Sequence, residues 1–100
     1  MITSKQRAAL KGMANTMEAI GQVGKGGIVD TLITQVDDAL TARELIKFKV
    51  LETCPQDAKE IAGEIAEKTR SEVVQVIGRR FVLYRANPKK PVGERIVLNP

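Results

Sequence analysis

The sequence predicts an α/β fold (α+β by another convention) in which a four-stranded mixed sheet packs on helices. Its 100 residues suffice for one domain with a single modest core. Apolar residues recur alternately at helical spacing and with a period of two, in the order α-β-α-β-α-β-β. Only Gly78 and Arg79 separate the last two strand segments, which predicts a hairpin with glycine at the first turn position.

The first 23 residues predict a capped helix and a short strand. Thr3 and Gln6 have the spacing of a capping box, with Thr3 as the N-cap. The helix is expected to continue to about Thr16, with an apolar stripe of Ala9, Leu10, Met13 and Met17. Residues 19–23 form the strand candidate.

The middle of the chain predicts a turn, a second helix and a strand. Three glycines in positions 24–27 argue against a regular element there. The helix is expected over about residues 28–42, because one apolar stripe runs through it: Val29, Leu32, Ile33, Val36 and Leu40. Residues 44–52 alternate, which predicts a strand with Ile46 and Phe48 on its buried face and with Lys47 and Lys49 on the other.

A third helix and the hairpin complete the predicted domain. Pro55 suits the first position of the helix, with Thr53 or Cys54 as its cap. The buried stripe consists of Ala58, Ile61, Ala62, Ile65 and Ala66, and the outer face of Asp57, Glu60, Glu64 and Glu67. Strands are expected at residues 73–77 and 80–85. Each strand-helix-strand connection should join parallel neighbours in the sheet.

Residues 87–100 are predicted to be a basic tail outside a domain of residues 1–86. Pro88, Pro91 and Gly93 indicate an irregular linker. Residues 96–98 are either a short edge strand or disordered.

Composition excludes several classes of site. Without histidine there is no Ser-His-Asp triad and no histidine-bearing zinc site. A single cysteine forms no intramolecular disulfide, which fits a reducing compartment. No apolar run approaches ~18 residues, and the first residues show no signal peptide. We therefore expect a cytoplasmic protein that is not an enzyme and has no metal or other cofactor.

The net charge of +4 is unevenly distributed. Residues 79–100 contain six bases against Glu94 alone, and residues 1–25 contain four bases against Glu18 alone. Basic regions at both ends of the chain favour a polyanionic partner. An ordinary solvated surface with a solubilising tail explains the same charges.

The best candidate site is the glycine turn Gly24-Lys25-Gly26-Gly27 before the second helix. Glycines allow another backbone to approach, and the first amides of a helix bind anions. Gly26 directly after Lys25 breaks the P-loop pattern, and Val29 stands where the dinucleotide fingerprint requires a third glycine. Two interpretations remain. The turn is a Gly-x-x-Gly loop that clamps a nucleic-acid backbone, or it is an ordinary tight turn.

Four blocks of the chain resemble the YhbY-type CRM domain, named for chloroplast RNA splicing and ribosome maturation. The blocks are Thr3-Ser4-Lys5-Gln6-Arg7 with Leu10-Lys11-Gly12, Gln22-Val23-Gly24-Lys25-Gly26-Gly27, Arg43-Glu44-Leu45-Ile46-Lys47, and Gln75-Val76-Ile77-Gly78-Arg79 with Val82-Leu83-Tyr84-Arg85. The resemblance covers about residues 2–86. It implies a fold similar to the C-terminal domain of translation initiation factor three, RNA binding through the Gly-x-x-Gly loop, and association with precursors of the large ribosomal subunit.

The candidate RNA contacts are therefore the four loop residues Gly24, Lys25, Gly26 and Gly27. Charge adds Lys11, Arg43, Lys47, Arg79 and Arg80. The aromatic residues are few (Phe48, Phe81 and Tyr84) and are expected in the core, so recognition should rely on phosphates and shape.

Two functions from different classes remain open on the sequence. The first is a monomeric, non-catalytic RNA-binding assembly factor whose partner is ribosomal RNA. The second is a protein–protein adaptor with a basic docking tail, and DNA binding is a weaker third alternative.

Overall fold

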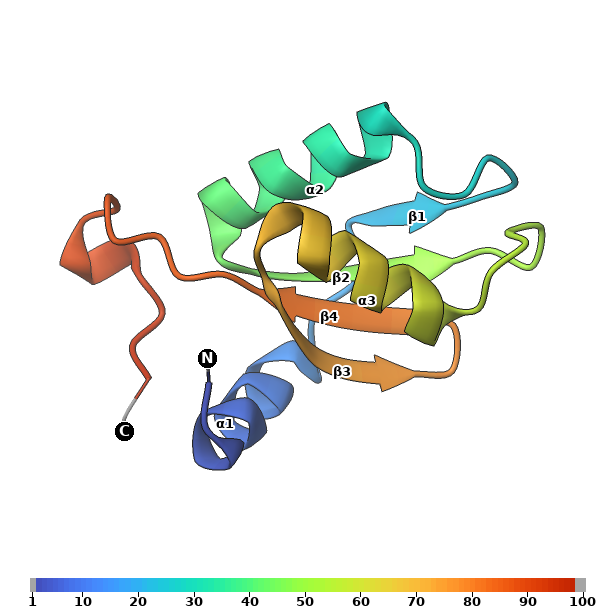
Figure 1. Ribbon diagram of the computed structural model, residues 1–100. Helices are drawn as coiled ribbons and strands as arrows, with labels where there is room; N and C mark the ends of the chain where they lie inside the picture. Colours follow the sequence, from blue (N-terminus) through green and yellow to red (C-terminus); the bar gives the residue numbers. More distant parts are fainter. Residues whose placement is uncertain (1, 99–100) are drawn as a thin grey trace.

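The computed structural model describes residues 2–98 and contains three helices and four strands, in the predicted order (Figure 1). The elements are α1 (Ser4–Ala14), β1 (Gly21–Val23), α2 (Asp30–Arg43), β2 (Leu45–Val50), α3 (Ala58–Thr69), β3 (Glu72–Ile77), β4 (Arg80–Tyr84) and a final 3₁₀ turn, Val92–Glu94. Except at the start of α3, the predicted ends of the helices and strands lie within two residues of these. The fold class is therefore confirmed: a mixed α+β domain built on a four-stranded sheet.

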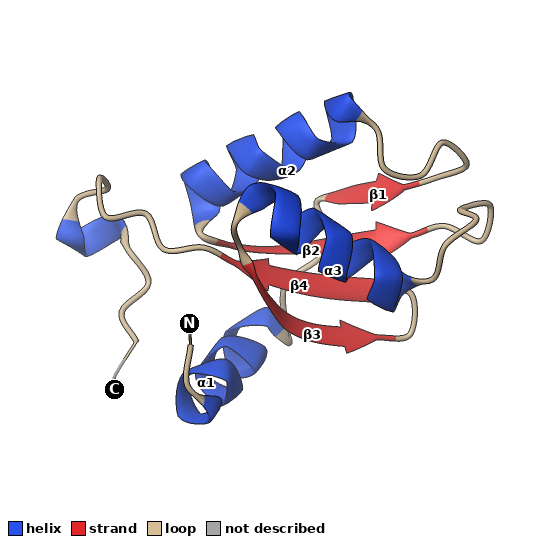
Figure 2. Cartoon of the chain, viewed as in Figure 1, coloured by secondary structure: helices blue, strands red, loops and turns tan. Residues whose placement is uncertain are grey.

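The strand order of the sheet is β1-β2-β4-β3. β1 runs parallel to β2, as expected, and β4 lies antiparallel to both of its neighbours (Figure 2). The prediction that the second crossover joins neighbouring strands is wrong, because β4 pairs with β2 and thereby separates it from β3. The two-residue turn of the hairpin is confirmed, with Ile77 opposite Arg80 and Gly78 at φ 56°.

Both faces of the sheet are covered, which the sequence did not indicate for β2. On one face, α2 and α3 pack on Ile46, Phe48, Val50, Phe81 and Leu83 to form the main core. On the other face, Leu10 and Ala14 of α1 pack on a smaller cluster: Leu45, Val74, Val82 and Tyr84. The lysine face of β2 is therefore only partly open to solvent.

The ends of two helices show how local sequence sets their bounds. At α1 the capping box is confirmed: the Thr3 hydroxyl accepts from the Gln6 amide, and the Gln6 side chain accepts from the Thr3 amide. At α3 the prediction of a cap at Thr53 or Cys54 is wrong. The cap is Asp57, whose carboxylate accepts from the Glu60 amide at 2.8 Å.

The C-terminal tail folds back onto the domain. Residues 96–98 form no strand, so the added edge strand is not present in the described chain. Instead, the buried carboxylate of Glu44 accepts the amides of Asn87 (2.8 Å) and Ile96 (2.9 Å). Ile96 and Leu98 pack against the α1 cluster. The carboxylate stabilises this arrangement because each half-buried amide gains a charged acceptor.

Candidate nucleic-acid interface

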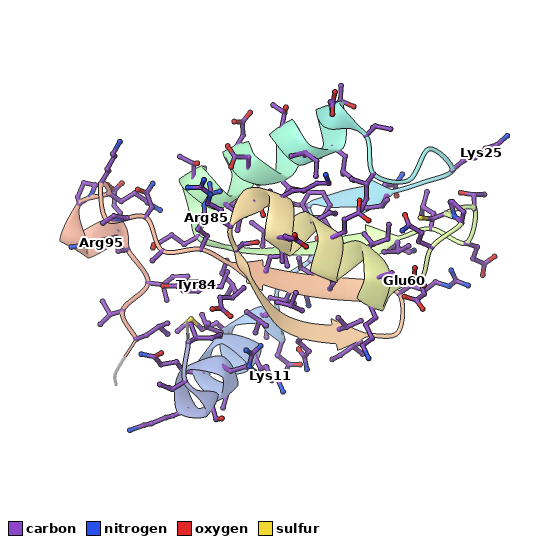
Figure 3. The ribbon with its side chains drawn as sticks, in the orientation of Figure 1. Lys11, Lys25, Glu60, Tyr84, Arg85 and Arg95 are labelled. Carbon is purple, nitrogen blue, oxygen red and sulfur yellow. The ribbon has the colours of Figure 1, made fainter. Side chains whose placement is uncertain are left out.

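The glycine loop is a tight turn with a lysine at its tip. The Gly27 amide donates to the Gly24 carbonyl at 2.9 Å, so Lys25 and Gly26 occupy the two central positions. Gly27 has φ +65°, a conformation that glycine adopts without the strain that a side chain introduces. The Lys25 side chain is exposed and projects away from the body of the molecule (Figure 3).

The loop leads directly into the N-terminus of α2. Val29 is the N-cap residue, and no side chain of the described chain caps this helix end. The first amides of the helix therefore face solvent beside the glycine backbone, with the positive end of the helix dipole behind them. Asp30 in the first turn offsets part of this positive potential. The arrangement can hold an anion through main-chain N–H groups and the Lys25 ammonium together.

Sheet topology brings the hairpin to the same end of the molecule. The Leu51 amide donates to the Val23 carbonyl at 2.8 Å, and the Val50 amide donates to the Arg79 carbonyl at 2.6 Å. The ends of β1 and β2 and the hairpin turn are thus adjacent. Lys25, Arg79 and Arg80 are exposed there, and within residues 2–98 none of them forms an ion pair. We call this the loop end.

The other three basic candidates do not join the loop end. Arg43 is the last residue of α2, at the opposite end of that helix from the glycine loop, and Lys11 is exposed on α1 (Figure 3). Lys47 is half-buried and donates to the Met17 carbonyl at 2.8 Å. Its side chain therefore also holds the connection between α1 and β1 against the sheet.

Two basic residues near the tail, Arg85 and Lys90, are held by contacts within the fold. Arg85 pairs with Asp37 at 2.6 Å and donates to the Thr69 carbonyl at 2.7 Å. Lys90 donates to the Ala42 carbonyl at 2.9 Å. These contacts join the tail end of β4 to both outer helices, whereas Lys89 and Arg95 form no ion pair within residues 2–98.

All three aromatic rings are buried, as expected. Phe48 and Phe81 stack in the main core with ring centroids 6.0 Å apart, and Tyr84 is buried in the α1 cluster. Aromatic stacking on bases is therefore not available at the surface. An interface must use charge, main-chain donors and polar side chains.

Three residues near Arg80 are not candidate RNA contacts in the sequence, because they are uncharged and lie outside the glycine loop. Asn15, Gln75 and Ile77 line a small hollow together with Lys47 and Arg80. Gln75 and Ile77 both lie in β3, whereas Asn15 directly follows α1, so only the position of α1 on the sheet brings them together.

Two kinds of feature are absent from residues 2–98, a membrane-spanning helix and a cluster of metal-binding side chains. No helix among residues 2–98 is long and apolar enough to span a membrane. No group of three or more cysteine, aspartate or glutamate side chains in the same range could hold a metal ion.

Comparison with known proteins identifies relatives along nearly the whole chain. A family model, the CRS1 / YhbY (CRM) domain, matches residues 2–85. "Probable RNA-binding protein YqeI" of Bacillus subtilis (strain 168) is 45% identical over 85 residues, which is 85% of this chain and 88% of the relative. An "RNA-binding protein" of Haemophilus influenzae is 30% identical over 91 residues, or 91% of this chain and 92% of the relative.

A solved structure is also similar. The solution structure of the Staphylococcus aureus protein SAV1595, which is described as a candidate RNA-binding protein, has a TM-score of 0.79 and 45% sequence identity. The match covers 99% of this chain and 100% of that one.

Proposed function

The chain belongs to the CRS1 / YhbY (CRM) domain family, and from this premise we propose that it binds RNA by clamping the backbone at the Gly24–Gly27 loop. The observation that carries the proposal is the exposed glycine turn at the uncapped start of α2, with Lys25 at its tip. The names of the two relatives support the same ligand class.

The clamp works through main-chain donors and the exposed Lys25 cation. A phosphate approaches the glycines closely because no side chain blocks them, and it accepts from the free amides at the start of α2. Lys25 neutralises the phosphate, while Arg79 and Arg80 contact the backbone further along. Affinity then depends strongly on salt and only modestly on base sequence.

We also propose a non-catalytic, monomeric assembly factor that associates with precursors of the large ribosomal subunit, as the family resemblance implies. The alternative, an adaptor that docks through its tail, is disfavoured because Glu44 and Lys90 tie the tail to the domain. Sedimentation of cell extracts distinguishes the two. Co-sedimentation with ribosomal precursors should be lost after RNase treatment, and its persistence would support the adaptor.

The test of the clamp is the salt dependence of RNA binding by Lys25→Gln. Fluorescence anisotropy with a labelled RNA hairpin over a range of salt concentrations yields the slope of log K against log [salt]. If Lys25 neutralises one phosphate, its removal should reduce the magnitude of the slope by roughly 0.7–0.9.

Lys68→Gln is the matched control, since Lys68 is exposed in the last turn of α3, away from the loop end. Its slope should equal that of the unmodified protein. An unchanged slope for Lys25→Gln would remove Lys25 from the interface.

A further inference from the structure

We propose that the hollow between α1 and the β3–β4 hairpin receives one unpaired base of the RNA. This inference rests on the proposed RNA binding and adds a ligand class to it: a nucleobase, held beside the phosphate clamp. The hollow lies on the α1 face of the sheet, where α1 ends and the strands continue beyond it.

The hollow has the size and the walls of a site for a small ring. Its volume is about 120 Å³, whereas a water molecule requires only roughly 10–15 Å³. The residues that line it are Asn15, Lys47, Gln75, Ile77, Arg80 and Val82. Lys47, Val82 and Gln75 form one cross-strand row, and Arg80 pairs with Ile77 in the next.

The chemistry of these walls matches a base better than a bare phosphate. Val82 and the 61%-exposed Ile77 supply an apolar surface for the flat ring. The amides of Asn15 and Gln75 each carry a donor and an acceptor, which is what the edge of a base requires. The planar guanidinium of Arg80 can stack on a base where aromatic rings are absent from the surface.

The charges of the lining residues make this hollow a better RNA site than the larger ones. Hollows of about 460 and 350 Å³ near the tail contain Glu72 and Glu44, respectively, whose carboxylates repel RNA. The hollow beside Arg80 has two cations and no carboxylate in its lining. A further hollow of about 390 Å³ contains Arg85 and Lys89 and no carboxylate, but Arg85 is already paired with Asp37 at 2.6 Å. The hollow beside Arg80 differs in that neither of its two cations forms an ion pair within residues 2–98.

The hollow is also continuous with the loop end. Arg79 and Arg80 follow each other in the hairpin, and the Arg79 carbonyl accepts from the end of β2, next to β1 and the glycine loop. Lys49 pairs with Arg80 on the same sheet face and lies between them and β1. One RNA strand can therefore pass from the clamp along these cations to the hollow.

The test compares two RNA duplexes that differ only in one bulged nucleotide, measured by fluorescence anisotropy. The unmodified protein should prefer the bulged duplex. The double variant Asn15→Ala/Gln75→Ala changes no charge, so its salt slope should not change. It should nevertheless lose at least about fivefold of the preference for the bulge, the order expected when two hydrogen bonds are removed.

Gln35→Ala is the matched control, because Gln35 is an exposed amide on α2, outside the hollow and on the opposite face of the sheet. It should retain the full preference. Gln75→Glu, nearly identical in shape, provides a second variant should the double variant unfold, and its carboxylate should abolish the preference.

The outcomes separate the two proposals. Equal binding of both duplexes by the unmodified protein, or an unchanged preference in the double variant and in Gln75→Glu, overturns the base site and leaves the phosphate clamp intact. If the unmodified protein binds neither duplex, both proposals fail.

Discussion

The basic residues fall into two groups. Some donate hydrogen bonds that hold the fold together, and others are exposed and available to bind RNA. Arg7, Lys47 and Arg85 each donate to a main-chain carbonyl of another part of the chain. A cation whose N–H groups are occupied in this way is less able to release counterions from a phosphate. Lys25 and Arg79 have no ion pair within residues 2–98 and should therefore dominate the salt dependence.

The sequence does not distinguish Lys25 from Lys47. Both are lysines in blocks that match the family, and both are predicted RNA contacts. What differs is the Met17 carbonyl, which lies within 2.8 Å of Lys47 only because the α1–β1 connection crosses the sheet there. Such a long-range contact has no local periodicity and cannot be predicted from one strand.

Tyr84 offers a spectroscopic test of the packing around α1, since it is the one tyrosine and there is no tryptophan. Burial raises the pKa of its phenol above 10.0, and the Glu44 carboxylate raises this pKa further. The folded pKa thus exceeds the unfolded one. The contribution of Tyr84 to stability is fully present below pH 10.0 and is lost as the pH rises through the folded pKa.

An ultraviolet titration of the phenolate should therefore have a higher midpoint in the native protein than in denaturant. Glu44→Gln should lower the native midpoint without bringing it to the denatured value, because burial is the larger cause. Equal midpoints in the folded and unfolded protein would contradict the buried position of Tyr84.

The sequence predicts the presence of each helix better than the residue at which the helix begins. Apolar stripes located α1, α2 and α3, because helical spacing persists over several turns. The start of α3 was misplaced because proline and aspartate both suit a helix start. The Asp57 side chain resolves the choice, since its carboxylate reaches the Glu60 amide.

Asp57→Ala should destabilise the protein by about 1 kcal/mol, the usual cost of removing an N-cap side chain. Thr53→Ala, at the wrongly predicted cap, should leave the free energy of unfolding nearly unchanged. Urea unfolding of both variants measures the difference. Equal losses, or a larger loss for Thr53→Ala, would mean that α3 begins earlier than Ala58.

In the molecule as a whole, the local hydrophobic patterns did not determine the order of the strands in the sheet. Either strand of the hairpin could pair with β2. The alternation of apolar and polar residues along a strand is the same whichever strand lies beside it, so this alternation does not identify the neighbour. One indication was present: β4 contains Phe81, Val82, Leu83 and Tyr84 in succession, a run typical of a strand covered on both faces. Such a strand belongs in the interior of the sheet, where β4 lies.

Charge is also divided between the two sides of the molecule. α1 contains Lys5, Arg7 and Lys11 and no acid, and Lys47, Lys49 and Arg80 lie on the sheet face that it partly covers. α3 packs on the opposite face, and its exposed side contains three acids against two bases: Glu60 (Figure 3), Glu64 and Glu67 against Lys59 and Lys68. This division of charge supports the proposal that RNA meets the loop end and the α1 face of the sheet rather than α3.

An NMR titration of isotope-labelled protein with an RNA hairpin shows directly whether RNA contacts the glycine loop. The amide signals of Gly24, Gly26 and Gly27 should shift first and furthest, together with that of Arg79. The amides of Asn87 and Ile96, which Glu44 holds at the other end, should not move. Saturable RNA binding with unmoved loop signals, and with shifts confined to the tail or α3, would contradict RNA contact at the loop.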